Sequence, residues 1–184
     1  AGIMLVISIT SLISGNFWGI IVTEKLHIPA ENIAIFPFIK SAIMLVFFFF
    51  VMPQLNKYHF KLPMSVGFFG YVASQWVLIM APEQGFAFLV FNVFLEACSF
   101  AAVTPLVDQL TVLTIDAKER ARILSILSVG IILLTAPFGW IAGTLSEMNK
   151  DLPFILNIVL FAVGAGLAYI AGSRKNLAPE AAVA

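Results

Sequence analysis

The sequence predicts an all-α membrane protein with six transmembrane helices, and three observations lead to this fold class. Hydrophobic residues fill 61% of the 184 positions and the mean hydropathy is +1.03, whereas soluble domains hold roughly 45–50% apolar residues. A soluble fold of this size could not keep that much apolar surface from water. The apolar residues gather in six runs, and none shows the two-residue alternation of an outer-membrane barrel strand, so helices are the better prediction.

Each of the six runs is close to the roughly 20 residues that a membrane-spanning helix needs. The third run is the shortest. Their approximate ranges are 3–22, 33–53, 63–81, 86–110, 121–145 and 152–172.

The first run, 3–22, carries several polar side chains. Ser11, Ser14 and Trp18 recur at helical spacing and therefore share one face of the predicted helix. We select Ser11 and Trp18 as candidates for contact with a substrate. Two structural interpretations stay open, because serine can bond to its own or a neighbouring helix and tryptophan is common at membrane interfaces.

The second run, 33–53, contains Lys40 and the aromatic stretch VFFFFV. From a helix start near Ile33, Lys40 lies about 10 Å below the outer membrane boundary. Ionisable side chains inside a span are costly and mark functional sites by default. The structural alternative is that the Lys40 stem extends toward the outer headgroups. The phenylalanines are most simply a surface for lipid or for packing.

The fourth run, 86–110, contains Glu96, and from a start near Phe86 this carboxyl lies about 15 Å deep. The similar depth allows an ion pair between Lys40 and Glu96. Asn92 and Ser99 share the helical face of Glu96, and we expect this polar stripe to face the bundle interior or a water-filled cavity. We predict a substrate or proton-coupling role for Glu96, Asn92, Ser99 and Lys40; a structural, hydrogen-bonded carboxyl is the alternative for Glu96.

Small residues at four-residue spacing in the fifth and sixth runs predict close helix packing. They are Gly139 and Gly143, followed by Gly164, Ala168 and Gly172. Pro105 and Pro137 predict kinks in their helices.

Lysine and arginine predict which side of the membrane each connection faces. Seven of the ten basic residues share one side: Lys57, Lys61, Lys118, Arg120, Arg122, Arg174 and Lys175. The opposite connections carry only Lys25 and Lys150. We therefore expect a multi-pass protein of the cytoplasmic membrane with both termini in the cytoplasm.

Other function classes find little support. The net charge of zero provides no basic surface for nucleic acid. No CxxC, HExxH, P-loop or GxGxxG pattern is present, and the single Cys98 lies in an apolar run. His27 and His59 fall in connections on opposite sides. We predict no catalytic residue, metal or cofactor, and hence no enzyme.

The chain starts at Ala1, almost inside its first span, without a charged region followed by a cleavage site. This start does not read as a signal peptide. We expect it to be a piece of a longer chain, entered just before a helix.

Two stretches resemble the C-terminal half of a major facilitator superfamily transporter. DQLTVLTIDAKERARILSILSVGIILLTAPFGWIAGTL, at 108–145, resembles that family's tenth-helix end, a connection with an acid followed by paired arginines, and the glycine-rich eleventh helix. FWGIIVTEKLHIPAENIAIFPFI, at 17–39, resembles the junction of the seventh and eighth helices. The connection at 53–63 departs from the family, since it keeps only the basic character of a glycine-and-aspartate motif.

The resemblance implies one six-helix bundle over 1–184, built as two inverted three-helix repeats at about 1–81 and 84–172, with a short cytoplasmic tail at 173–184. The N-terminal six-helix half of the same transporter, or a second copy of this chain, would complete it. A small organic solute would bind between the halves, and we expect its transport by alternating access to be proton-coupled.

The resemblance also suggests a role for the charged connection DAKERARI, 116–123. In the family such a connection closes the cytoplasmic gate through ion pairs. We predict a gate formed by Asp108, Asp116, Arg120 and Arg122, in which Asp108 pairs with Arg120 or Arg122. The alternative is that the charges mark membrane topology and nothing more.

Two competing functions stay open. The first is a six-helix structural or assembly subunit that does not transport. The second is a membrane-embedded enzyme, which would need clustered histidine or carboxylate ligands that the sequence lacks.

Overall fold

The computed structural model of the chain describes residues 2–29, 33–51, 61–83, 85–116 and 119–175. Within this part of the chain the secondary structure is helical, as predicted. The elements are α1 (Gly2–Ile20), the π-helical turn η1 (Ile21–Lys25), α3 (Ile35–Phe50), α5 (Lys61–Met80), α6 (Phe86–Thr114), α7 (Arg120–Met148) and α8 (Leu152–Lys175).

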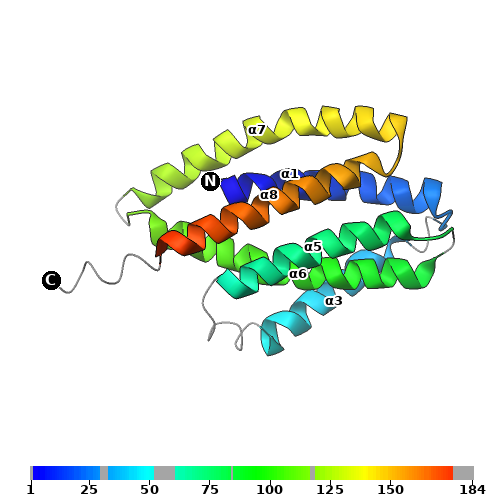
Figure 1. Ribbon diagram of the computed structural model, residues 1–184, viewed down its shortest axis with the longest axis horizontal. Helices are drawn as coiled ribbons and strands as arrows, with labels where there is room; N and C mark the ends of the chain where they lie inside the picture. The colour runs from blue at the N-terminus through cyan, green and yellow to red at the C-terminus, as the bar shows by residue number, and fades with distance from the viewer. Residues whose placement is uncertain (1, 30–32, 52–60, 84, 117–118, 176–184) are drawn as a thin grey trace.

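The long helices run up and down the bundle in turn (Figure 1). The beginnings of α1, α5 and α7 lie at one end of the bundle, together with the ends of α3, α6 and α8. This is the alternation expected for six consecutive crossings, and it brings both ends of the described helical chain to the same side.

Five helical segments are long and apolar enough to cross a membrane: Gly2–Lys25, Pro63–Met80, Phe86–Val112, Arg120–Met148 and Leu152–Ile170. The sixth helix, α3, is equally apolar but has only 16 residues. The described part of the chain is therefore all-helical, and its long apolar helices make the protein a multi-pass membrane protein.

The helix ends differ from the predicted runs in several places. The first helix continues through η1 to Lys25, and α7 continues to Met148, each beyond its last predicted residue. The predicted run 33–53 yields a helix only over Ile35–Phe50, and its last two residues lie outside the described residues. The predicted tail begins inside α8, which extends to Lys175, while residues 176–184 lie outside the description.

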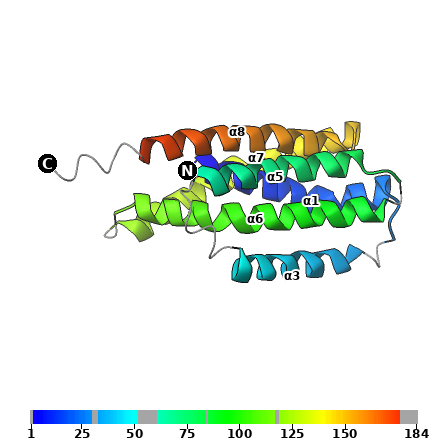
Figure 2. The ribbon, with the colours of Figure 1, turned by 60° about the horizontal axis from the view of Figure 1, so that its bottom comes forward.

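The helices pack in a simple order. At the centre α5 packs against α6 and α8; α6 in turn packs against α3, and α8 against α1 and α7. The outer helix α7 also packs against α1. Among the described helices, α3 packs strongly only against α6. Figure 2 shows α3 beside α6, separate from the other helices.

Small residues permit two close crossings near the centre. A Cβ added to Gly70 of α5 would collide with Ser99 Oγ of α6. A Cβ added to Gly164 of α8 would lie 2.7 Å from Phe68 Cε1 and 3.1 Å from Val6 Cγ1. The predicted packing role of Gly164 is confirmed. In α7, Gly139 faces Leu12, but Gly143 faces open space.

The outer surface of α7 is almost uncovered. Only 6% of its span is buried, against 33–44% in the other four long segments. Trp140 of α7 is 75% exposed and Trp76 of α5 is 56% exposed. In a membrane, these surfaces contact lipid or another chain.

Candidate binding cavity

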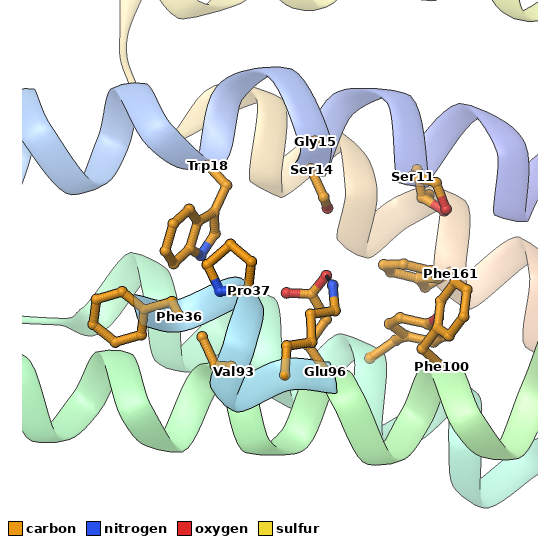
Figure 3. A pocket seen from close by; sticks show the side chains of 13 residues that line it. Ser11, Ser14, Gly15, Trp18, Phe36, Pro37, Val93, Glu96, Phe100 and Phe161 are labelled. Carbon is orange, nitrogen blue, oxygen red and sulfur yellow. Dashed lines mark hydrogen bonds and ion pairs between the residues drawn. The ribbon is translucent and has the colours of Figure 1, made fainter. Parts of the chain in front are cut away.

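A partly open cavity of about 340 Å³ lies among five helices. Its walls come from α1 and α6 on two sides, from α3, and from single residues of α5 and α8 (Figure 3). The lining residues are Thr10, Ser11, Ser14, Gly15, Trp18, Phe36, Pro37, Lys40, Tyr71, Val93, Glu96, Phe100 and Phe161.

The cavity sits between two separate apolar clusters of the bundle. Phe36 and Val93 belong to a cluster near the η1 end, whereas Tyr71 and Phe161 belong to a cluster nearer the other end. The cavity therefore lies at an intermediate height in the bundle, where an ionisable group is far from both ends of the bundle.

An ion pair stands in this cavity. Lys40 Nζ donates a hydrogen bond to Glu96 Oε1 at 2.7 Å, so the pair allowed by the depth estimate is present. The Glu96 side chain is 12% exposed and that of Lys40 is 31% exposed. The Lys40 ammonium also lies over the ring of Phe100, 6.0 Å from its centroid.

Aromatic rings stand on both sides of the Glu96 carboxylate (Figure 3). On one side Trp18 meets Phe36 edge to face, with ring centroids 5.6 Å apart. On the other side Phe100 and Phe161 line the wall, and Phe161 stacks on Tyr71 at 4.3 Å. Such rings provide apolar contact area and negatively polarised faces.

Asn92 lies behind the cavity wall instead of in it. Its side chain is fully buried, and its Nδ2 donates to the Ser74 carbonyl oxygen at 2.7 Å. Its Oδ1 accepts a long hydrogen bond, 3.4 Å, from Trp18 Nε1. Asn92 therefore joins α6 to α5 and orients Trp18, and Trp18 is a wall residue with a polar anchor.

Ser99 also lies outside the cavity lining. Its Oγ donates to the Leu95 carbonyl oxygen at 2.7 Å, and it packs against Gly70 where α5 crosses α6. Its small size is what this crossing needs. Of the six residues predicted for substrate or coupling, the cavity therefore brings together Ser11, Trp18, Lys40 and Glu96.

Several lining residues were not selected from the sequence. Ser14 accepts a hydrogen bond from Asn157 Nδ2 of α8 at 3.1 Å, and its shared face with Ser11 and Trp18 was the available signal. Phe36, Phe100 and Phe161 offered no signal, because the chain holds 18 phenylalanines in similar apolar runs.

The predicted gate residues lie around the α6–α7 connection. Asp108 is exposed on α6, Asp116 lies in the connection, and Arg120 and Arg122 occupy the first turn of α7. Among ion pairs between described residues, none joins Asp108 to either arginine; these pairs are Lys25–Asp151, Lys40–Glu96 and Lys150–Glu24. The latch stays a prediction.

Two of these ion pairs fasten the opposite end of the bundle. Lys25 Nζ donates to Asp151 Oδ1 at 2.7 Å and to the Ile79 carbonyl oxygen at 2.8 Å. Lys150 pairs with Glu24 at 2.7 Å. The two pairs tie η1 to the α7–α8 turn.

Metal ligation finds no support in the described part of the chain. No group of three histidine, cysteine, aspartate or glutamate side chains there is close enough to hold a metal ion. His27 is exposed beside η1, with its Nδ1 3.1 Å from the Lys25 carbonyl oxygen. His59 lies outside the described residues.

The fold and the cavity define a class: a multi-pass helical membrane protein with an ion-paired, aromatic-walled cavity. No protein-family model, curated protein or solved structure matches the chain. The functional argument therefore depends on the geometry of the bundle and its cavity.

Proposed function

We propose that the chain is one six-helix half of a secondary active transporter of the major facilitator type, which moves a small organic solute across the cytoplasmic membrane by alternating access. The observation that carries this proposal is the Lys40–Glu96 pair in a cavity between helices. Ionisable groups inside a membrane bundle mark substrate, ion or proton pathways. The cavity size is at the lower end of the roughly 300–1,000 Å³ of small-molecule sites.

The packing order supports a bundle of two inverted three-helix repeats. In such a bundle α1 corresponds to α6, α3 to α7 and α5 to α8. The contact between α1 and α8 then corresponds to the contact between α6 and α5. In the same way, the contact between α1 and α7 corresponds to the contact between α6 and α3. The central α5–α8 contact maps onto itself. Each corresponding pair runs in opposite directions (Figure 1), as inverted repeats require. The α7–α8 contact alone has no strongly packed counterpart among the described helices.

The uncovered surfaces support a partner for this half. The cavity is partly open, and α7 has a span that is only 6% buried. A second six-helix unit, either the N-terminal half of the same transporter or a second copy of this chain, would place substrate between the two units.

Proton coupling is assigned to Glu96. When Glu96 is ionised it holds the Lys40 ammonium, and a proton on the carboxyl removes that attraction. Because Lys40 is on α3 and Glu96 on α6, protonation changes the contact between two helices. A charge contact that forms in one state and breaks in another is the kind of device that biases a bistable bundle.

The proposal is tested in proteoliposomes that contain the protein as its gene encodes it. A panel of small organic solutes is offered with and without an imposed proton gradient, and uptake or efflux is measured. We expect the gradient to drive one solute, and Glu96→Gln to abolish the coupling. Glu83→Gln, which neutralises an exposed carboxylate in the α5–α6 connection, is the matched control and should couple normally.

A second candidate function is a non-transporting structural or assembly subunit of the membrane. It is favoured by the way the Lys40–Glu96 pair fastens the otherwise lightly packed α3 to α6. If well-folded protein moves no solute, this candidate replaces the transporter. If transport occurs but Glu96→Gln couples normally, the transporter stands and Glu96 is a structural carboxyl.

A further inference from the structure

We infer that the ligand of the cavity is an organic ammonium with an aromatic or other compact apolar body, which binds Glu96 in place of Lys40. This inference rests on the proposed function, because it names the substrate class of the same site. It depends on three features of the cavity: the group that now binds the Glu96 carboxylate, the member of the ion pair that can move away, and the side chains that surround the pair.

The carboxylate already binds an ammonium. Lys40 Nζ lies 2.7 Å from Glu96 Oε1 and 6.0 Å from the Phe100 centroid. It therefore makes a charge-assisted hydrogen bond and lies within range of an aromatic face. A ligand ammonium placed at this position would meet the same two groups without any rearrangement of α6.

The lysine is the movable partner of the pair. Lys40 is the more exposed of the two, at 31% against 12% for Glu96, and its flexible four-carbon stem can carry the ammonium toward water. Its helix, α3, has Phe36 as its only buried side chain in the described part of the chain. Glu96 belongs to α6, which packs against both α5 and α3.

The charge of the ligand follows from this difference. A cationic ligand that displaces Lys40 keeps the less exposed carboxylate paired and releases the more exposed ammonium, whose flexible stem can reach out of the cavity. An anionic ligand that captured Lys40 would leave Glu96 without a partner, and an unpaired charge with little exposure is strongly destabilising. The cavity therefore favours a cation over an anion.

The walls define the rest of the ligand. Trp18 and Phe36 stand on one side of the carboxylate, and Phe100 and Phe161 stand on the other (Figure 3). A flat apolar body can lie against either pair. The volume of about 340 Å³ suits a small ligand.

Four probes with the same phenyl group and different charge test the inference: 2-phenylethylammonium, 3-phenylpropanoate, phenylalanine and 2-phenylethanol. Binding to the purified protein, as its gene encodes it, is measured in lipid nanodiscs by isothermal titration calorimetry. We expect 2-phenylethylammonium to bind at least about tenfold more tightly than the other three. Glu96→Gln should remove this preference.

The decisive variant is Lys40→Met, which removes the internal competitor of the ligand. It should raise the affinity for 2-phenylethylammonium by about tenfold, because the binding-competent site is no longer occupied. A gain of affinity cannot result from misfolding. The matched control is Lys25→Met, which removes a lysine of similar exposure, 29%, from its ion pair with Asp151 outside the cavity; it should leave the affinity unchanged.

Tightest binding of phenylalanine or 3-phenylpropanoate would overturn the inference, as would weaker cation binding in Lys40→Met or binding of none of the four probes. The proposed function fails separately. If the cation binds as expected but no solute crosses proteoliposomes, the ligand class stands and the transporter proposal is lost. If an anion is transported through the cavity, the transporter stands and the ligand class is wrong.

Discussion

Glu96 and Lys40 were predictable from the sequence because ionisable residues are rare in apolar runs. Counting the rise per residue from each helix start was enough to put the two charges at similar depth, and the structure joins them at 2.7 Å. The environment of Asn92 and Ser99 was not predictable in this way. A helical face is wide enough to meet two neighbours, and α5 covers both residues through Ser74 and Gly70.

At the same scale, Gly164 lies at a position where the neighbouring helices leave no room for a larger side chain. Gly164→Val would push a side chain against Phe68 and Val6, and overpacking of this kind costs about 1–3 kcal/mol. We expect a lower midpoint of thermal unfolding in detergent. Gly166→Val, two residues away on an exposed position with no atom within 4 Å of the added Cβ, should change the midpoint little. Equal midpoints for the two variants would contradict the close α8 crossing.

Among the elements, the apolar runs predicted which segments form helices but not where these helices end. Helical hydrogen bonding continues past the end of the predicted run 3–22, as in η1, where Leu26 N donates to the Ile21 carbonyl oxygen at 3.1 Å. The second run shows the opposite difference, because its helix is shorter than the run 33–53 and ends at Phe50. Hydropathy alone therefore does not determine the length of a helix.

The attachment of α3 is the element-scale feature with the clearest test. Phe36 inserts between Trp18 and Phe86, with centroid distances of 5.6 and 5.4 Å. Phe36→Ala would leave a cavity there. If this weakens the attachment by about 2 kcal/mol, amide exchange of α3 rises by roughly thirtyfold.

Hydrogen exchange with mass spectrometry over residues 35–50 measures this effect. Phe38→Ala is the matched control, because Phe38 is 75% exposed and its removal leaves no internal cavity. Similar exchange in the two variants would mean that contacts other than Phe36 hold α3 to the bundle.

For the whole molecule, the sequence predicted the alternation of the helices but not their packing order. The spans are apolar on most sides, so the pattern does not show which face meets a neighbour. Charge was more informative, because the seven clustered lysines and arginines predict a common side for the connections that hold them. The beginning of α1 and the end of α8 do lie at the same end of the bundle (Figure 1).

The predicted latch belongs to this scale, since it concerns two states of the whole protein. Asp108→Asn should shift the protein toward cytoplasm-open states and speed the labelling of a cavity cysteine, Ser11→Cys, by a membrane-impermeant maleimide added on the cytoplasmic side. Because an exposed pair is worth about 0–1 kcal/mol, we expect at most about a fivefold increase.

Cys98→Ser provides the background for this measurement, and Glu147→Gln, an exposed carboxylate at the other end of α7, provides the control. An unchanged labelling rate in Asp108→Asn would remove the latch and leave membrane topology as the role of the charged connection.

The uneven exposure of the three tryptophans gives the protein its own optical reporters. Trp18 borders the cavity, whereas Trp76 and Trp140 project outward from α5 and α7. Brominated acyl chains would quench the two outward indoles, and a solute in the cavity would alter the emission of the third. The occupancy of the cavity and the lipid contact of the bundle can thus be followed separately by fluorescence, without an added dye.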